Sequence, residues 1–117
     1  MAIYYTDGSS TIGVKSAYCV TDENGKVLIT QWSMSPDDKT NNEEEYRGVI
    51  AALNLCAEGD EICTDSKLVV EQVAGRFKVK KLHLKNLCET VKDLLFTKKA
   101  KLTWIGRESN LAGKVFE

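Results

Sequence analysis

The chain has 117 residues, of which 43% are hydrophobic and 28% are charged, and these values are typical of a soluble globular protein. No apolar run in the sequence approaches the length that crosses a bilayer, so we do not expect a membrane-spanning protein. We therefore expect a single domain over residues 1–117, and we expect it to be a cytoplasmic monomer with no membrane partner. The cysteines match no zinc or redox spacing and are expected to be reduced and mostly buried: Cys19, Cys56, Cys63 and Cys88.

Charge is distributed unevenly along the chain, although the net charge is only -1. Residues 1–65 contain 4 basic and 12 acidic side chains, whereas residues 66–117 contain 12 basic and 5 acidic ones. An acidic half beside a basic half suits a protein that concentrates cations at one place and binds a polyanion at another. Chance clustering of charges on a solvated surface would give the same pattern, so the asymmetry supports cation and polyanion binding without establishing it.

The first third of the chain predicts three strands. Residues 2–6 form a run of apolar, aromatic and β-branched side chains that ends at Asp7 and Gly8, and this pattern indicates a strand. Residues 14–20 and 27–32 give two further strands, joined by an Asn-Gly turn that favours a hairpin. Asp7 followed by glycine fits either a turn aspartate or a carboxylate at the ligand-binding end of a strand.

A helix is predicted after a loop at residues 36–40. Asn42 is the expected N-cap, with Glu45 three residues later as in a capping box. The apolar face of this helix is spaced by three and four residues and comprises Tyr46, Val49, Ile50, Leu53 and Ala57. Residues 61–64 then predict a short strand that ends at Asp65.

The basic half of the chain predicts two more helices and a final strand. The helices are expected over residues 66–74 and 84–98, separated by Gly75 and by a segment, 76–81, with four basic residues in six. The last strand is expected over residues 101–105, and at most one turn of helix follows it. The element order is therefore β-β-β-α-β-α-α-β.

This order predicts an α/β fold with a five-strand mixed sheet, strand order 3-2-1-4-5, and helices on both faces. The strand–helix–strand passages require right-handed crossovers, which make the later strands parallel to the first. The carboxyl ends of strands 1 and 4 then flank the topological switch point. Asp7 and Asp65 follow these strand ends, and neighbouring strands lie about 4.8 Å apart, so the two carboxylates could share a metal ion.

Glu45 has two possible roles. It either folds back on Asn42 as a capping-box residue or points toward Asp7 and Asp65. Three converging carboxylates would repel one another, and a bound divalent cation would relieve that repulsion. Ligands that are all oxygen suit magnesium or manganese.

Three motifs of this chain together resemble a known family. The segments Thr6-Asp7-Gly8-Ser9, Thr40-Asn41-Asn42 followed by Glu45, and Thr64-Asp65-Ser66 are similar to the first three acidic motifs of type 1 ribonuclease H. Their order and spacing match, and the resemblance covers nearly the whole chain. The short connection at residues 75–82 is similar to that of compact archaeal-type and some bacterial members, which lack a longer basic segment.

The resemblance implies an endonuclease that hydrolyses the RNA strand of RNA–DNA hybrids and leaves 3′-hydroxyl and 5′-phosphate ends. It implies a two-metal-ion mechanism in which Asp7, Glu45 and Asp65 bind Mg²⁺, with Mn²⁺ as a substitute. It also implies contacts to the nucleic acid from a further group of residues, namely Gly8, Ser9, Asn41 and Asn42. Loop and cap chemistry would explain the two asparagines equally well.

The chain departs from the family at the fourth acidic residue. The family carries an aspartate four residues after an asparagine, and here that spacing leads to Lys114. A shortened turn would put Asn110 in the aspartate's place, so we predict that Asn110 is a catalytic residue and an amide-oxygen ligand. Glu108 is the second candidate. Arg107 stands near the place of a family histidine, and His83 is expected to be structural or solvated.

Two alternatives remain open. Resolvases, integrases and some exonucleases use related acidic sites, although Asn41-Asn42 followed by Glu45 favours the hybrid-cutting branch of the family. The missing fourth acid also leaves open a catalytically weak hybrid-binding module.

Overall fold

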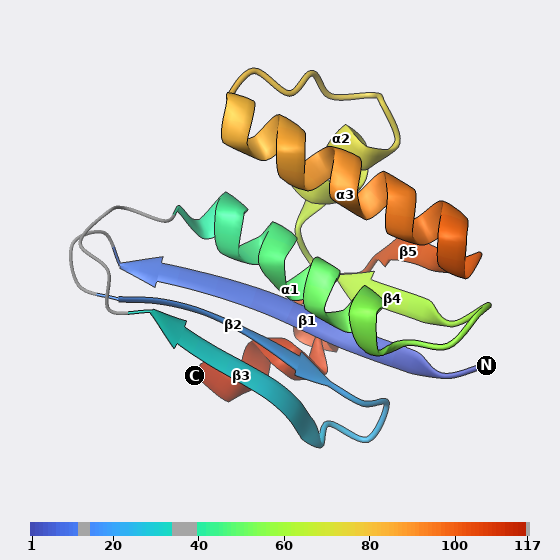
Figure 1. Cartoon of the computed structure of the whole chain (residues 1–117). Helices are drawn as coiled ribbons and strands as arrows, with labels where there is room; N and C mark the ends of the chain where they lie inside the picture. Colours follow the sequence, from blue (N-terminus) through green and yellow to red (C-terminus); the bar gives the residue numbers. More distant parts are fainter. Residues whose placement is uncertain (12–14, 34–39, 117) are drawn as a thin grey trace.

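A five-stranded mixed sheet forms the centre of the molecule. The computed structural model describes residues 1–11, 15–33 and 40–116 (Figure 1). The strands lie in the order β3-β2-β1-β4-β5, which confirms the predicted order. The strand β1 pairs antiparallel with β2 and parallel with β4. The strand bounds are β1 Ile3–Thr11, β2 Lys15–Thr21, β3 Val27–Ser33, β4 Glu61–Thr64 and β5 Lys101–Trp104.

The first strand is longer than predicted. It does not end before Asp7, because its antiparallel pairing with β2 continues as far as Thr11. Its parallel pairing with β4 covers only Ile3 to Thr6. Asp7 therefore lies within β1, at the point where the neighbouring strand β4 stops. The predicted start of the second strand at residue 14 and the loop at 36–39 lie outside the described residues.

The α-helices cover one face of the sheet, and the 3-10 helix η2 packs against β1 and β2 on the opposite face (Figure 1). Helices therefore lie on both faces of the sheet, as predicted, although η2 is longer than the single turn expected from the sequence. None of the helices in the described residues combines the length and apolar character needed to cross a membrane. The helix bounds are α1 Asn41–Leu55, α2 Lys67–Val73, α3 Leu82–Lys98, η1 Arg107–Ser109 and η2 Leu111–Phe116.

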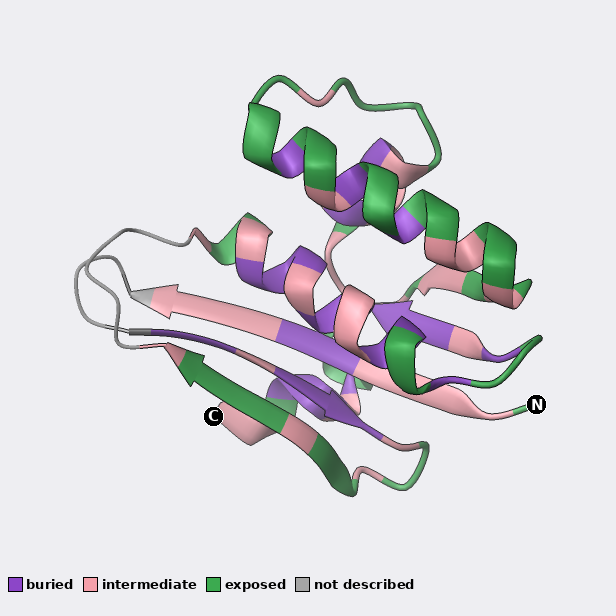
Figure 2. Cartoon of the chain, in the orientation of Figure 1, coloured by how far each residue is buried: buried purple, intermediate pink, exposed green. Residues whose placement is uncertain are grey.

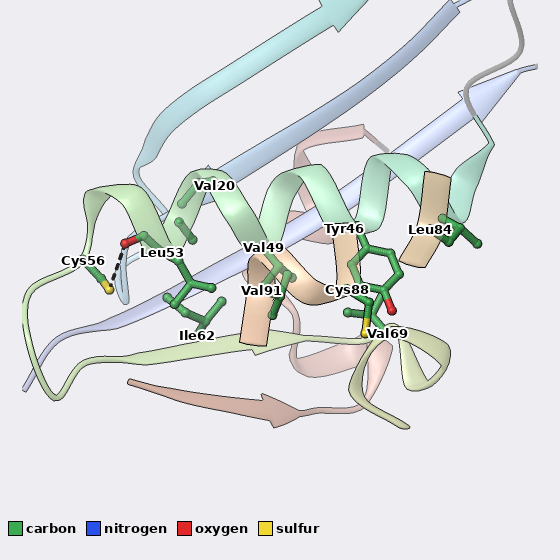
Figure 3. Packing of buried hydrophobic residues seen from close by; sticks show 11 residues of the cluster. Val20, Tyr46, Val49, Leu53, Cys56, Ile62, Val69, Leu84, Cys88 and Val91 are labelled. Carbon is green, nitrogen blue, oxygen red and sulfur yellow. Dashed lines mark hydrogen bonds between the residues drawn. The ribbon is translucent and has the colours of Figure 1, made fainter. Parts of the chain in front are cut away.

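The hydrophobic core lies between the sheet and the α-helices (Figure 3). Tyr46, Val49 and Leu53 on the inner face of α1 are fully buried, as their spacing predicted. Burying each large apolar side chain contributes about 1.5–3 kcal/mol, so this face fixes α1 on the sheet. Ala57 was expected to extend this face, but it is exposed because α1 already ends at Leu55.

Burial by residue follows the layers of the fold (Figure 2). The outer side of α3 is exposed, whereas the middle of β1 and most of β2 are buried. The Tyr46 hydroxyl donates a 2.7 Å hydrogen bond to Gln72 Oε1, which ties α1 to α2 inside the core. All four cysteines are free and buried, as expected.

The start of α1 differs from the prediction in a way that affects the site. Thr40, not Asn42, is the N-cap, and its hydroxyl accepts a 3.2 Å hydrogen bond from the Glu43 N–H. Glu43 therefore stands three residues after the cap, the position that Glu45 was expected to take. Glu45 lies two residues further into the helix and has no capping role. The helix α3 also begins two residues earlier than expected, at Leu82.

Candidate active site

Three carboxylates from three separate elements converge at one end of the sheet. Asp7 lies in β1, Glu45 in the second turn of α1, and Asp65 directly after β4. Each offers a carboxylate oxygen, and these oxygens all lie within 4.8 Å of one another. Asp7 and Glu45 are buried, whereas Asp65 is partly exposed. The structure thus brings together the three acids that the sequence predicted to meet.

The early end of β4 and the absence of a side chain at Gly8 allow Glu45 to reach the sheet. Beyond Thr6, none of the described strands pairs with the edge of β1 that faces β4, and the Gly8 N–H donates a hydrogen bond to Glu45 Oε1. A Cβ atom at Gly8 would lie only 2.4 Å from the backbone nitrogen of Glu45 and 2.5 Å from the carbonyl carbon of Glu44. Glycine at this position is therefore required for α1 to cross β1 so closely.

Burial and mutual repulsion raise the pKa values of two of the acids, Asp7 and Glu45. Burial, followed by the charge of Asp7 and a hydrogen bond with it, raises the pKa of Glu45 to about 9. Burial also raises the pKa of Asp7, and the hydrogen bond with Glu45 opposes this rise. In the metal-free protein at neutral pH, Glu45 therefore carries a proton that it donates to Asp7. Arg107 Nη1 lies 3.9 Å from Asp65 Oδ2, but this arginine is largely exposed and pairs weakly.

This donor set fits a hard divalent cation. All three donors are carboxylates, and a cation among them would replace the proton on Glu45 and remove the repulsion. Oxygen-only ligation suits Mg²⁺ and Mn²⁺. Cys19 pairs with Asp7 across the sheet, but burial raises the pKa of its thiol to about 12, and the thiol donates to the Ala112 carbonyl at 3.3 Å. The thiol therefore stays protonated and is not a ligand.

Asn110 lies beside the acids, as predicted, but it presents its amino group to them. Its Nδ2 donates to the Thr6 carbonyl at 2.9 Å and to Asp65 Oδ2 at 3.1 Å, while its Oδ1 accepts from the Ala112 N–H at 3.0 Å. A carbonyl can only accept and an N–H can only donate, so these partners fix which way the amide points. In this arrangement Asn110 is a hydrogen-bond donor to Asp65 and offers no oxygen to a cation.

Glu108, the second candidate for the fourth position, does not belong to the cluster of carboxylates that lie within 4.8 Å of one another. The exposed Glu108 carboxylate lies close to Gly106, where an added Cβ would come within 2.6 Å of Glu108 Oε1. Lys114 is exposed as well. The sequence reasoning missed Gly113, which lines the site with Asp7. A glycine offers no side chain, so no residue-type signal could have identified it.

Of the three acids, Asp7 lines a surface pocket of about 230 Å³, which we call the acidic pocket. The predicted contact residues Gly8, Ser9 and Asn41 line this pocket. Asn42 lines two pockets in the same region, one of which, of about 200 Å³, also contains Lys78, Lys80 and Lys81. The described residues that line the acidic pocket are Asp7, Gly8, Ser9, Ser10, Asn41, Arg107, Gly113 and Phe116.

Two other features lie apart from this chemistry. A larger pocket of about 490 Å³ is lined by residues of β2, β3, α1 and α3, among them Tyr18, Ile29 and Leu87, and none of its described lining residues is acidic. The exposed His83 has its Nε2 3.7 Å from Glu43 Oε1, consistent with the expected solvated side chain. Neither feature contributes to the acidic site.

Comparison with known proteins identifies the family. The Reverse transcriptase-like family matches residues 5–116. The N-terminal RNase H domain of Rv2228c from Mycobacterium tuberculosis, solved as a fusion with maltose binding protein, superposes with a TM-score of 0.74 at 32% identity, over 93% of this chain and 84% of that chain. The chain belongs to the ribonuclease H family. This confirms the resemblance inferred from the three acidic motifs.

Other ribonuclease H structures extend the comparison. LC11-RNase H1, solved in complex with an RNA/DNA hybrid, superposes with a TM-score of 0.68 at 28% identity, over 94% of this chain and 88% of that chain. RNase H1 from the halophilic archaeon Halobacterium salinarum NRC-1 shares the fold, with a TM-score of 0.74 at 22% identity, over 97% of this chain and 92% of that chain. The curated Bifunctional protein Rv2228c of M. tuberculosis is 56% identical over 45 residues, which is 35% of this chain but only 12% of that protein.

Proposed function

We propose that this protein is an endonuclease that hydrolyses the RNA strand of RNA–DNA hybrids with the help of divalent cations, leaving 3′-hydroxyl and 5′-phosphate ends. The observation that carries the proposal is the convergence of Asp7, Glu45 and Asp65 within 4.8 Å at one end of a ribonuclease H sheet. The choice of substrate is supported by LC11-RNase H1, which was solved with an RNA/DNA hybrid.

The three acids would hold the cations, with Mg²⁺ as the expected ion and Mn²⁺ as a substitute. When bound, such ions polarise the scissile phosphate and lower the pKa of an attacking water. The protein's own contribution is to hold the ligands rigidly. The Gly8 N–H fixes Glu45, while Asn110 and the Trp104 indole, whose Nε1 donates to the Asp65 carbonyl at 3.2 Å, fix Asp65.

The surface around the acids would bind the hybrid. The two asparagines at the start of α1 and the Gly8-Ser9 backbone flank the acidic pocket, where they would contact the RNA strand across the minor groove. The lysines of the adjoining pocket would contact phosphates and carry no sequence information. They are Lys78, Lys80 and Lys81.

A second candidate function is a hybrid-binding module with weak catalysis. One observation favours it: within residues 107–116, no carboxylate reaches the acidic cluster, because Asn110 presents its amino group and Glu108 lies over Gly106. The binding surface is unaffected by this difference, so binding without rapid hydrolysis is chemically reasonable.

A substrate panel distinguishes the two functions. End-labelled RNA–DNA hybrid, duplex DNA and single-stranded RNA would be incubated with the protein over a series of Mg²⁺ and Mn²⁺ concentrations, with a chelator as the blank. We expect cleavage of the RNA strand in the hybrid alone, and only with a divalent cation. Binding of the hybrid without cleavage at any cation concentration would favour the binding module, and cleavage of duplex DNA would contradict both.

A further inference from the structure

Gly113 lies directly over the acidic cluster. It belongs to η2 and is buried, and a Cβ atom added to it would lie 3.8 Å from Asp7 Oδ2 and 3.9 Å from Asp65 Oδ2. Both distances are ordinary van der Waals contacts, so a Cβ atom at residue 113 would meet no clash and would point a side chain toward the two carboxylates. Gly113 is not among the described glycines with positive φ, so other residues can adopt its backbone conformation.

The backbone around Gly113 is firmly held. The Gly113 N–H donates to the Asn110 carbonyl at 3.1 Å, and the preceding N–H, that of Ala112, donates to Asn110 Oδ1 at 3.0 Å. The Ala112 carbonyl accepts from the Cys19 thiol at 3.3 Å, which ties η2 to β2. The direction in which a side chain at 113 would point is therefore a property of the fold.

Neither of the oxygen-bearing candidates for the fourth position fills this space, and Arg107 approaches Asp65 with a nitrogen, its Nη1 lying 3.9 Å from Asp65 Oδ2. The Asn110 oxygen is bonded to Ala112, and the carboxylate of Glu108 lies over Gly106. Small hard cations such as Mg²⁺ and Mn²⁺ prefer six oxygen ligands, and three carboxylates shared between two ions leave the second ion short of protein ligands. A side chain on residue 113 would be placed to supply a further ligand, because its Cβ would lie 3.8 Å from Asp7 Oδ2 and 3.9 Å from Asp65 Oδ2.

We infer that Gly113, rather than Asn110 or Glu108, occupies the ligand position that is missing from this site. Because glycine has no side chain, the free protein binds one divalent cation tightly on Asp7, Glu45 and Asp65. A carboxylate at residue 113 would complete a second cation site between Asp7 and Asp65. This inference rests on the proposed function, since it assumes that the acidic cluster binds catalytic cations.

Calorimetric titration with Mn²⁺ in the absence of nucleic acid tests the inference. The proteins compared would be the wild type, Gly113→Asp and, as the matched control for the loss of glycine, Gly113→Ala. We expect the wild type and Gly113→Ala to bind one ion per chain. We expect Gly113→Asp to bind a second ion, or to bind the first about tenfold more tightly, because added ligand charge strengthens such sites. Equal titrations of Gly113→Asp and Gly113→Ala, or two tight ions in the wild type, would overturn the inference.

Two more variants keep the test decisive if the fourth carboxylate destabilises the metal-free fold. Gly113→Asn supplies an oxygen ligand without charge, and we expect it to bind Mn²⁺ more tightly than Gly113→Ala does. If Gly113→Asp proves unfolded with and without Mn²⁺, equal affinities of these two variants would overturn the inference. Asn110→Asp should add no second ion, and a second ion in that variant alone would assign the missing position to Asn110.

The titration and the cleavage assay fail independently. If the wild type cuts no hybrid but Gly113→Asp gains a cation, the proposed function is wrong and the assignment of Gly113 stands. If the wild type cuts the hybrid and Gly113→Asp titrates like Gly113→Ala, the proposed function stands and the assignment is wrong.

Discussion

Replacing Glu45 by glutamine should change how the stability of the metal-free protein depends on pH. Burial and the neighbouring Asp7 raise the pKa of Glu45 to about 9 in the folded protein, from 4.5 for an unperturbed glutamate. Between these values the folded state binds more protons than the unfolded state, so the free energy of unfolding falls as pH rises. One proton corresponds to at most about 1.4 kcal/mol per pH unit, or about 2.7 kcal/mol between pH 6 and pH 8.

Urea unfolding followed by tryptophan fluorescence, with a chelator present, measures this slope at pH 6, 7 and 8. We expect the wild type to lose stability across the range and Glu45→Gln to lose much less, because its amide cannot release a proton. The control is Glu58→Gln, which changes an exposed glutamate and should keep the wild-type slope. Saturating Mg²⁺ should stabilise the wild type more at pH 8 than at pH 6, because the cation competes with the proton. A wild-type stability that stays flat or rises, or a Glu45→Gln slope equal to it, would refute the reasoning.

Three further predictions follow from the geometry. Gly8→Ala puts a methyl group 2.4 Å from the Glu45 backbone nitrogen and should lower the free energy of unfolding in urea by about 1–3 kcal/mol. The control Gly48→Ala, whose Cβ meets nothing closer than 3.4 Å, should lower it little, and equal losses in the two variants would contradict this account. Asn110→Ala should lower the free energy of unfolding by about 1–3 kcal/mol, because the buried Thr6 carbonyl and Ala112 N–H lose their partner. An unchanged free energy of unfolding would mean that this amide does not stabilise the fold. Neutralising the lysines that line the pocket of about 200 Å³ should weaken hybrid binding equally for all sequences and reduce the magnitude of the slope of log affinity against log salt concentration by about 0.9 per lost phosphate contact. An unchanged slope would place the nucleic acid elsewhere. The side chains to change together are Lys78, Lys80 and Lys81.

The strand order and the meeting of the three acids could be predicted from the sequence, because strong local rules determine both. Right-handed crossovers leave one natural order for these strands, and the carboxyl ends of neighbouring parallel strands lie side by side. Asp7 and Asp65 follow from that rule even though β1 continues past Asp7. The extension of β1 depends on its pairing with β2, which the apolar run at residues 2–6 does not reveal.

The cap of α1 could not be predicted because two overlapping patterns fit it. Thr40 with Glu43 and Asn42 with Glu45 both place an acidic residue three positions after a capping side chain. The structure uses the first pair, which leaves Glu45 to hydrogen-bond with Gly8. The choice depends on how α1 meets β1, and that is tertiary information.

The residue at the position of the missing fourth ligand could not be predicted from the sequence, for a different reason. The orientation of the Asn110 amide is fixed by the Thr6 carbonyl, 104 residues away in the chain, and by the nearby Ala112 N–H. Gly113 carries no functional group, so only the direction of its absent Cβ connects it with the acids. Spacing alone pointed to Lys114 or Asn110 instead.

The rate of RNA-strand cleavage by Asp65→Asn, measured beside Asp93→Asn, tests the central claim most directly. Both changes remove one carboxylate, but Asp65 belongs to the acidic cluster, whereas Asp93 is exposed on α3. At saturating Mg²⁺ on an RNA–DNA hybrid, we expect Asp65→Asn to lose at least about a hundredfold in rate while its circular dichroism stays native, and Asp93→Asn to keep the wild-type rate. Cleavage by Asp65→Asn at the wild-type rate would contradict the assignment of the active site.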